Sequence, residues 1–150
     1  MTETVNCNEH GPLVLSVIGP VIQVQIGFDE HFDPSASASL NLPDSTYPAL
    51  IDTGASECCI DSMLAAALNL PIVDRAVISG VHGRQEVNVH IGQIHVPKLR
   101  ITMYGRFVGV HLISGGQPYS ALMGRSFLAL TTMAYDGSSG NVFLSPAPSA

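Results

Sequence analysis

The chain has 150 residues, of which 46% are hydrophobic and only 12% are charged, and its formal net charge is −6. This length suits one domain with a sizeable core and is short for two. The six Lys and Arg residues form no stripe or cluster, which argues against nucleic-acid binding, and no apolar run approaches the ~20 residues that a membrane-spanning helix needs.

The three cysteines, Cys7, Cys58 and Cys59, have no zinc-ligand spacing and leave an odd thiol, so a disulfide framework is not expected. Adjacent cysteines are typical of small core residues, and a redox pair is the alternative. The N-terminus shows no basic region followed by an apolar one. We therefore expect a soluble, cytoplasmic protein.

Charge is distributed unevenly along the chain. Residues 1–74 hold ten Asp and Glu and no Lys or Arg, a net of −10, whereas residues 75–150 hold six Lys and Arg and two acids, a net of +4; the sum is −6. Opposite fields could help the chain pack on itself or on a second copy. A chance distribution over solvated loops explains the asymmetry equally well.

The N-terminal part predicts β structure after a polar start. Residues 1–11 are expected to form a loose segment. Residues 13–18 and 21–28 predict two strands, broken at Gly19-Pro20, that form a hairpin or a bent ribbon. Residues 29–46 are rich in Asp, Ser, Ala and Pro without periodicity, which predicts a long loop.

Residues 49–56, Ala-Leu-Ile-Asp-Thr-Gly-Ala-Ser, carry the most informative pattern. An apolar run of this length suits a buried strand, and Gly54 lets the backbone leave it abruptly, so Asp52 is expected at a strand end. A carboxylate there is costly to desolvate unless the Thr53 hydroxyl or the N–H groups of the turn bond it. This cost favours a catalytic Asp52 over a structural or relic acid.

The remaining pattern is again mainly β. Residues 58–60 predict a strand, followed by a short helix through residue 68 that Asp61 or Ser62 caps. Residues 76–79 and 86–91 predict a hairpin with a glycine-rich tip at 80–83. Residues 99–103 and 107–113 predict two further strands.

The segment at 49–56 resembles the active-site motif of aspartic proteases, in which two Asp-Thr/Ser-Gly loops meet and two carboxylates share a proton. A two-lobed pepsin-like enzyme needs a second motif and a chain about twice as long. The resemblance is therefore to the retropepsin-like family, which builds the pair from two identical subunits.

Three other segments agree with this family in order and rough spacing. Residues 121–128, Ala-Leu-Met-Gly-Arg-Ser-Phe-Leu, resemble its second signature and weakly echo 49–54, and residues 133–137 with 140–144 resemble the closing hairpin of bacterial members. Residues 78–84 resemble the tip of the flap that closes over substrate, although an ordinary hairpin turn is the alternative reading. The likeness covers residues 12–145, the expected domain, and leaves 146–150 as a tail.

Two departures concern the bracing of the site. Position 126 is Ser where the family usually has Asp or Asn, and position 56 is Ser where retroviral members carry an acid that pairs with the Arg of the second signature. Arg125 then needs another partner, either Glu57 or backbone carbonyls.

The resemblance implies a mainly β, closed retropepsin-like barrel with a flap hairpin and one or two short helices. It implies a homodimeric aspartic endopeptidase that acts on peptide or protein substrates without metal or cofactor; His82 at the flap tip could make closure depend on pH. The implied site residues are catalytic Asp52, Thr53 and Gly54, substrate-binding Ala55, Gly80, Val81, His82 and Gly83, and supporting Gly124 and Arg125.

Two rival readings remain open. A retropepsin-fold module that dimerises or binds peptides without useful activity would fit the Ser56 and Ser126 departures. An unrelated small β barrel that binds a small molecule would be a monomer.

Overall fold

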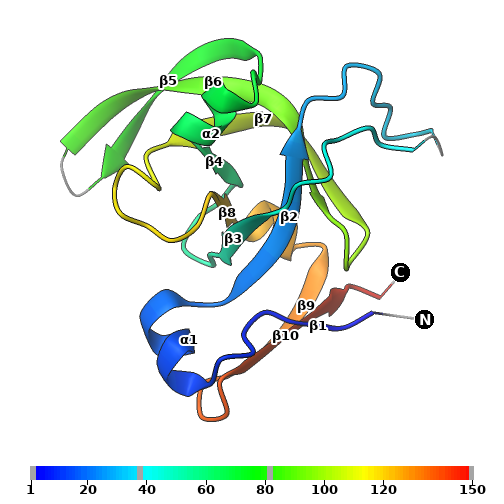
Figure 1. Ribbon diagram of the computed structural model, residues 1–150, viewed down its shortest axis with the longest axis vertical. Coiled ribbons are helices and arrows are strands. Elements are labelled where there is room, and N and C mark those ends of the chain that lie inside the picture. The colour runs from blue at the N-terminus through cyan, green and yellow to red at the C-terminus, as the bar shows by residue number, and fades with distance from the viewer. Residues whose placement is uncertain (1–2, 37–38, 81–82, 149–150) are drawn as a thin grey trace.

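The computed structural model describes residues 3–36, 39–80 and 83–148. This part of the chain is mainly β, as the sequence predicts, with short helices at three places instead of the expected one or two (Figure 1). The helices are α1 (Pro12–Ile18), α2 (Ser62–Ala67) and α3 (Arg125–Leu128). The strands are β1 (Val5–Asn6), β2 (Val21–Gly27), β3 (Tyr47–Ile51), β4 (Cys59–Asp61), β5 (Ile72–Gly80), β6 (Gly83–Val96), β7 (Ile101–Val110), β8 (Ala121–Met123), β9 (Thr131–Asp136) and β10 (Asn141–Pro146).

Six of these strands close into a barrel. They pair in the order β2-β3-β8-β4-β7-β6, and β6 pairs back with β2 through the register Ile26↔Ile94. Inside the ring, the side chains of Ile26, Ile60, Ile94 and Met123 are fully buried. Closure gives each of these six strands a paired neighbour on both sides, and β5 extends the sheet outward from β6.

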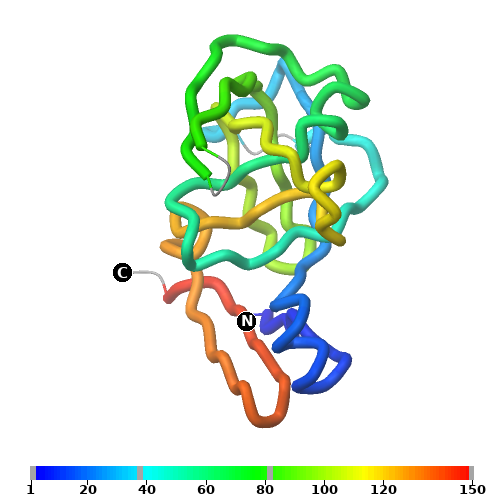
Figure 2. Tube along the Cα trace, turned by 90° about the vertical axis from the view of Figure 1, so that its left-hand side faces the viewer, coloured from blue at the N-terminus to red at the C-terminus, as the bar shows by residue number. Residues whose placement is uncertain are grey.

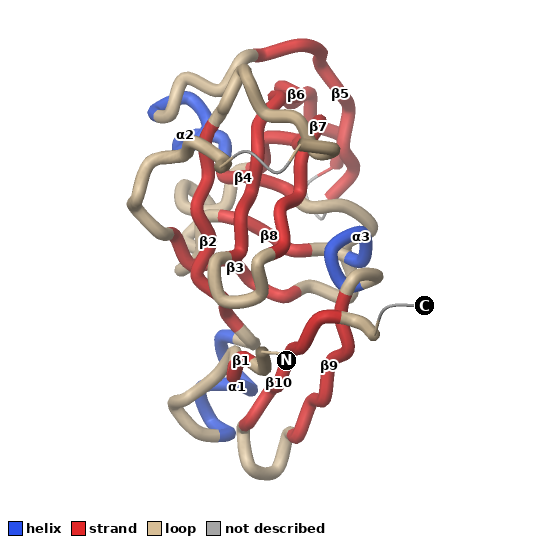
Figure 3. Tube along the Cα trace, turned by 90° about the vertical axis from the view of Figure 1, so that its right-hand side faces the viewer, coloured by secondary structure: helices blue, strands red, loops and turns tan. Residues whose placement is uncertain are grey.

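A second, three-stranded sheet of order β1-β10-β9 lies below the barrel (Figure 3). Its β9–β10 hairpin confirms the closing hairpin that the sequence predicts, with Asp136 accepting hydrogen bonds from Ser138 N and Ser139 N in the turn. The sheet also holds the start of the chain, where residues 1–11 were expected to be loose. There, Val5 pairs with Leu144, and Cys7 N donates to Val142 O at 2.7 Å.

The predicted strand at 13–18 is wrong, because this segment is helix α1. Pro12 occupies the first turn, where its fixed φ is helical and its missing N–H costs nothing. Leu15 is buried, whereas Leu13 and Val17 are about three-quarters exposed at 75% and 74%. A short apolar run fits both the 3.6-residue period of a helix and the two-residue period of a strand. Because 13–18 is a helix, the hairpin expected between it and β2 does not form.

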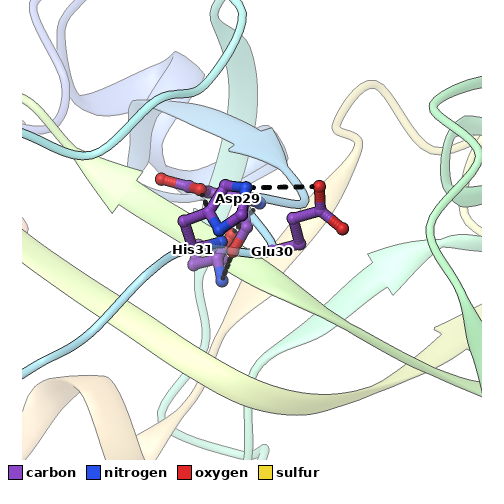
Figure 4. Close-up of polar contacts among 4 residues, drawn as sticks. Asp29, Glu30 and His31 are labelled. Carbon is purple, nitrogen blue, oxygen red and sulfur yellow. Dashed lines mark hydrogen bonds and ion pairs between the residues drawn. The ribbon is translucent and has the colours of Figure 1, made fainter.

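The long connection between β2 and β3 has no helix or strand in its described residues, 28–36 and 39–46, which confirms the predicted loop. Asp29 makes hydrogen bonds both to the barrel and to other residues of this loop. Its backbone N donates to Gln93 Oε1 at 2.7 Å, and its two carboxylate oxygens accept from His31 N and Asn41 N. Figure 4 shows Asp29 beside Glu30 and His31, and His31 Nε2 lies 3.4 Å from Glu30 Oε1 with both side chains exposed.

The middle of the chain follows its pattern with one simplification. The β5–β6 hairpin is present, whereas the two strands predicted at 99–103 and 107–113 are the single strand β7. Within β7, Gly105 has a φ of +112°, which glycine adopts readily, and it pairs with Gly92 of β6, so the strand continues through this position. Helix α2 is capped by Asp61, whose Oδ2 accepts from Leu64 N at 3.0 Å.

Candidate active site

The two segments that echo each other in sequence are neighbours in the barrel. β3 and β8 run parallel with the register Ala49↔Ala121, Leu50↔Leu122 and Ile51↔Met123. Because parallel strands end at the same edge of a sheet, the turn after β3 and the turn after β8 leave the barrel side by side. The first turn carries Asp52 and the second carries Gly124 and Arg125.

Asp52 lies half-buried at the end of β3, as the sequence predicts. Its N–H donates to Met123 O at 3.0 Å, which fixes it to β8. Its Oδ1 accepts from Gly54 N at 2.8 Å, and its carbonyl accepts from Ala55 N at 3.2 Å. The N–H of Gly54 therefore holds the carboxylate, while the side chains of Thr53 and Glu57 lie exposed.

The second turn packs directly against the first. A Cβ at Gly124 would lie 2.7 Å from Ala55 O and still closer to Glu57 O, so only glycine fits between the two turns. Arg125 N donates to Ala55 O at 2.8 Å, and Ser126 N donates to Ser56 O at 3.0 Å. These contacts make the two turns one rigid unit.

Arg125 completes this bracing through its side chain. Its Nη1 donates to Thr53 O at 2.7 Å, so the partner is a backbone carbonyl and not the Glu57 carboxylate. This charge-assisted bond joins the second turn to the turn that carries Asp52. The departures at positions 56 and 126 therefore leave the turn braced by backbone groups.

The β5–β6 hairpin overhangs a groove on the same side of the molecule. Its strands pair up to Gly80↔Gly83, and Val81 and His82, expected at the tip, lie outside the described residues. A groove of about 590 Å³ lies between the hairpin and the 111–120 loop, lined by Ile78, Gly80, Gly83, Arg84, Gln85, His111, Ser114 and Gly115. In Figure 1 the hairpin, the yellow loop at 111–120 and the turn after β3 all lie on the left, and this side faces the viewer in Figure 2.

Two residues near Asp52 were missed by sequence reasoning. Burial raises the pKa of Tyr119, and the negative charge of Asp52 raises it further. Burial, with smaller contributions from Cys58 and Asp52, raises the pKa of Cys59 to about 11. Tyr119 is half-buried and donates to Gln117 Oε1 at 3.0 Å. Its position just before the second signature was the one available signal.

Among residues 3–36, 39–80 and 83–148, no group of three or more His, Cys, Asp or Glu side chains could hold a metal ion. His90 in β6 is buried, at 3% exposure, and its Nδ1 lies 3.0 Å from Leu70 O. No helix in the described part of the chain is long and apolar enough to cross a membrane.

A single Asp-Thr-Gly turn, braced by a Gly-Arg turn at one edge of a closed barrel, defines an aspartyl protease-like domain of the retropepsin type. The chain belongs to the family described as gag-polyprotein putative aspartyl protease, whose model matches residues 38–129. This match includes both turns and the hairpin between them. No curated protein and no solved structure matches the chain.

Proposed function

We propose that the protein is an aspartic endopeptidase in which Asp52 from each of two identical chains forms the catalytic pair. The observation that carries this proposal is the placement of Asp52, half-buried at a strand end and held by Gly54 N at 2.8 Å. No second carboxylate bonds to Asp52 within the described part of the chain. A second copy would supply the missing acid.

The chemistry follows from two carboxylates brought within hydrogen-bond distance. Both cannot ionise cheaply, so one holds a proton while the other stays charged. The charged Asp52 takes a proton from a bound water as that water attacks the peptide carbonyl, and the protonated Asp52 donates to the carbonyl oxygen. The resulting diol collapses when a proton passes to the leaving nitrogen, without a covalent enzyme intermediate.

The surrounding residues have roles that suit this chemistry. Gly54 N orients the carboxylate, and the exposed Thr53 hydroxyl is free to reach the opposite turn of the dimer. Ala55, Gly80 and Gly83, with Val81 and His82, would contact an extended peptide beneath the hairpin, and side chains of that peptide would fill alternate pockets. Gly124 and Arg125 support the turn.

The test compares Asp52→Asn with Asp44→Asn, which changes an exposed acid of the 29–46 loop. Cleavage of a random peptide library is measured for both variants and for the wild type, with and without a statine-type inhibitor. We expect D52N to lose at least about 10²-fold in turnover while D44N cleaves like the wild type. Wild-type turnover in D52N, or no effect of the inhibitor, would rule out the mechanism.

A peptide-binding module without useful activity is the second candidate. The observation that favours it is that the Arg125 side chain bonds a backbone carbonyl of the turn and pairs with no acid in the described part of the chain. In this case the wild type would bind peptides without cleaving them, and D52N would bind them equally well.

A further inference from the structure

Asp61 is a buried carboxylate whose bonds exceed the needs of a helix cap. It is 1% exposed, and its Oδ2 accepts from Leu64 N at 3.0 Å in the first turn of α2. Its Oδ1 accepts from two further amides, Leu112 N and Ile113 N, each at 3.0 Å. A serine or threonine hydroxyl could satisfy the cap alone, so the second oxygen serves another element.

That element is the loop at 111–120, and Asp61 holds both of its ends. The side chain binds the start of the loop at Leu112 and Ile113, while the backbone N–H of Asp61 donates to Ser120 O at its end, at 2.8 Å. The next residue adds a contact, because Ser62 Oγ lies 2.8 Å from His111 Nδ1.

The loop depends internally on the same anchor. Gly115 N donates to Leu112 O at 3.1 Å, and Gln117 N donates to the same oxygen at 2.9 Å. Leu112 is therefore the point from which the loop is built, and its N–H donates both to Asp61 Oδ1 and, at 3.1 Å, to Val110 O. A shift of Leu112 would move the whole loop.

The loop forms one wall of the proposed substrate groove. His111, Ser114 and Gly115 line the space beneath the β5–β6 hairpin, and Tyr119 lies close enough to Asp52 for the charge of that carboxylate to act on it. Figure 1 shows the yellow loop between the hairpin and the turn after β3. Its position sets the distance between this wall and the hairpin.

We propose that Asp61 is a positioning residue for peptide substrate, which holds the 111–120 loop so that the groove is formed before substrate binds. This inference rests on the proposed endopeptidase function. Preformed walls contribute equally to substrate and transition-state binding, and loss of such binding raises KM with little change in kcat.

The experiment compares Asp61→Ser with Asp136→Ser. In D61S the hydroxyl keeps the cap of α2 but is too short to reach the loop. D136S removes an exposed carboxylate that likewise accepts turn N–H groups, from Ser138 and Ser139, in the β9–β10 turn. We measure kcat and KM on active-site-titrated enzyme, and hydrogen exchange at Leu64, Leu112 and Ile113.

D61S is expected to raise KM at least about fivefold while kcat stays within about twofold. Exchange should accelerate most at Ile113, because Leu112 N–H keeps its bond to Val110 O, and it should stay protected at Leu64. D136S should show neither effect. A wild-type KM in folded D61S would overturn the inference while leaving the endopeptidase intact. Absence of cleavage in the wild type would overturn the proposed function and this inference with it.

Asp61→Asn decides the question where D61S does not fold. Its amide oxygen can still accept from Leu112 N and Ile113 N, whereas its NH2 group cannot accept from Leu64 N. We expect a lower Tm with a wild-type KM. A raised KM in D61N, with the loop amides still protected from exchange, would contradict a positioning role.

Discussion

Gly124→Ala tests the contact that joins the two turns of the site. At φ −86° the backbone of Gly124 suits any residue, so the effect of the substitution is steric. The added Cβ would lie 2.7 Å from Ala55 O and closer to Glu57 O, both backbone atoms that cannot rotate away. The turns must therefore move apart.

The magnitude follows from two contributions. Overpacking of this kind costs about 1–3 kcal/mol. Weakening the bonds from Arg125 N to Ala55 O and from Ser126 N to Ser56 O adds up to about 0.5–1.5 kcal/mol each. Because both bonds lengthen only in part, G124A should lower the free energy of unfolding by about 2–4 kcal/mol.

Urea denaturation followed by circular dichroism measures this difference, and peptide cleavage measures its effect on the site. Gly137→Ala is the matched control, since its Cβ would meet only Tyr135 Cε1 at an ordinary 3.6 Å; we expect it within about 0.5 kcal/mol of the wild type. The cleavage activity of G124A should fall by a larger factor than its fraction of folded protein, because the displaced turn carries Asp52. Wild-type stability and cleavage in G124A would refute the close contact.

Three further outcomes are expected. Arg125→Lys keeps the charge but loses the directed bond to Thr53 O, so peptide cleavage should fall about 3–10-fold. The free energy of unfolding should change by less than about 1 kcal/mol, because the position is exposed; an unchanged kcat/KM would contradict this prediction. Burial raises the pKa of Cys7 from 9.0 to about 12, so its neutral form stabilises the fold below pH 9 and that stabilisation is lost as pH rises toward 12. Between pH 8 and 11 the free energy of unfolding should therefore decline less steeply in Cys7→Ala than in the wild type, and equal slopes would argue against a buried thiol. Burial lowers the pKa of His95 below 6.5, so stability should fall as pH drops through and below that value, and His95→Gln should remove part of this slope in thermal melts between pH 5 and 8.

Local chemistry made much of the site predictable from sequence. An apolar run ending in Asp-Thr-Gly specifies a strand, a turn and a carboxylate bonded by Gly54, and these are what the structure contains. The weak echo between 49–54 and 121–126 matches the pairing of β3 with β8 over its first three residues, although so short a likeness would not show that pairing unaided. The helix that follows predicted a cap at Asp61 or Ser62, and the structure has it at Asp61.

The failures arose where tertiary contacts decide. Residues 13–18 satisfy both strand and helix patterns, and the packing of Leu15 below the barrel selects the helix. The pairing of β2 with β6 joins residues such as Ile26 and Ile94 far apart in the chain, which no local pattern reveals. The second role of Asp61 depends on Leu112 and Ile113, which the parallel pairing of β4 with β7 brings beside it.

The most direct test of a catalytic pair mixes wild-type chains with D52N chains at constant total concentration and allows subunits to exchange. A site that needs Asp52 from both copies makes mixed dimers inactive, so an equal mixture should retain about one quarter of wild-type activity. A site that works within one chain would retain about half, and that result would contradict the shared carboxylate pair.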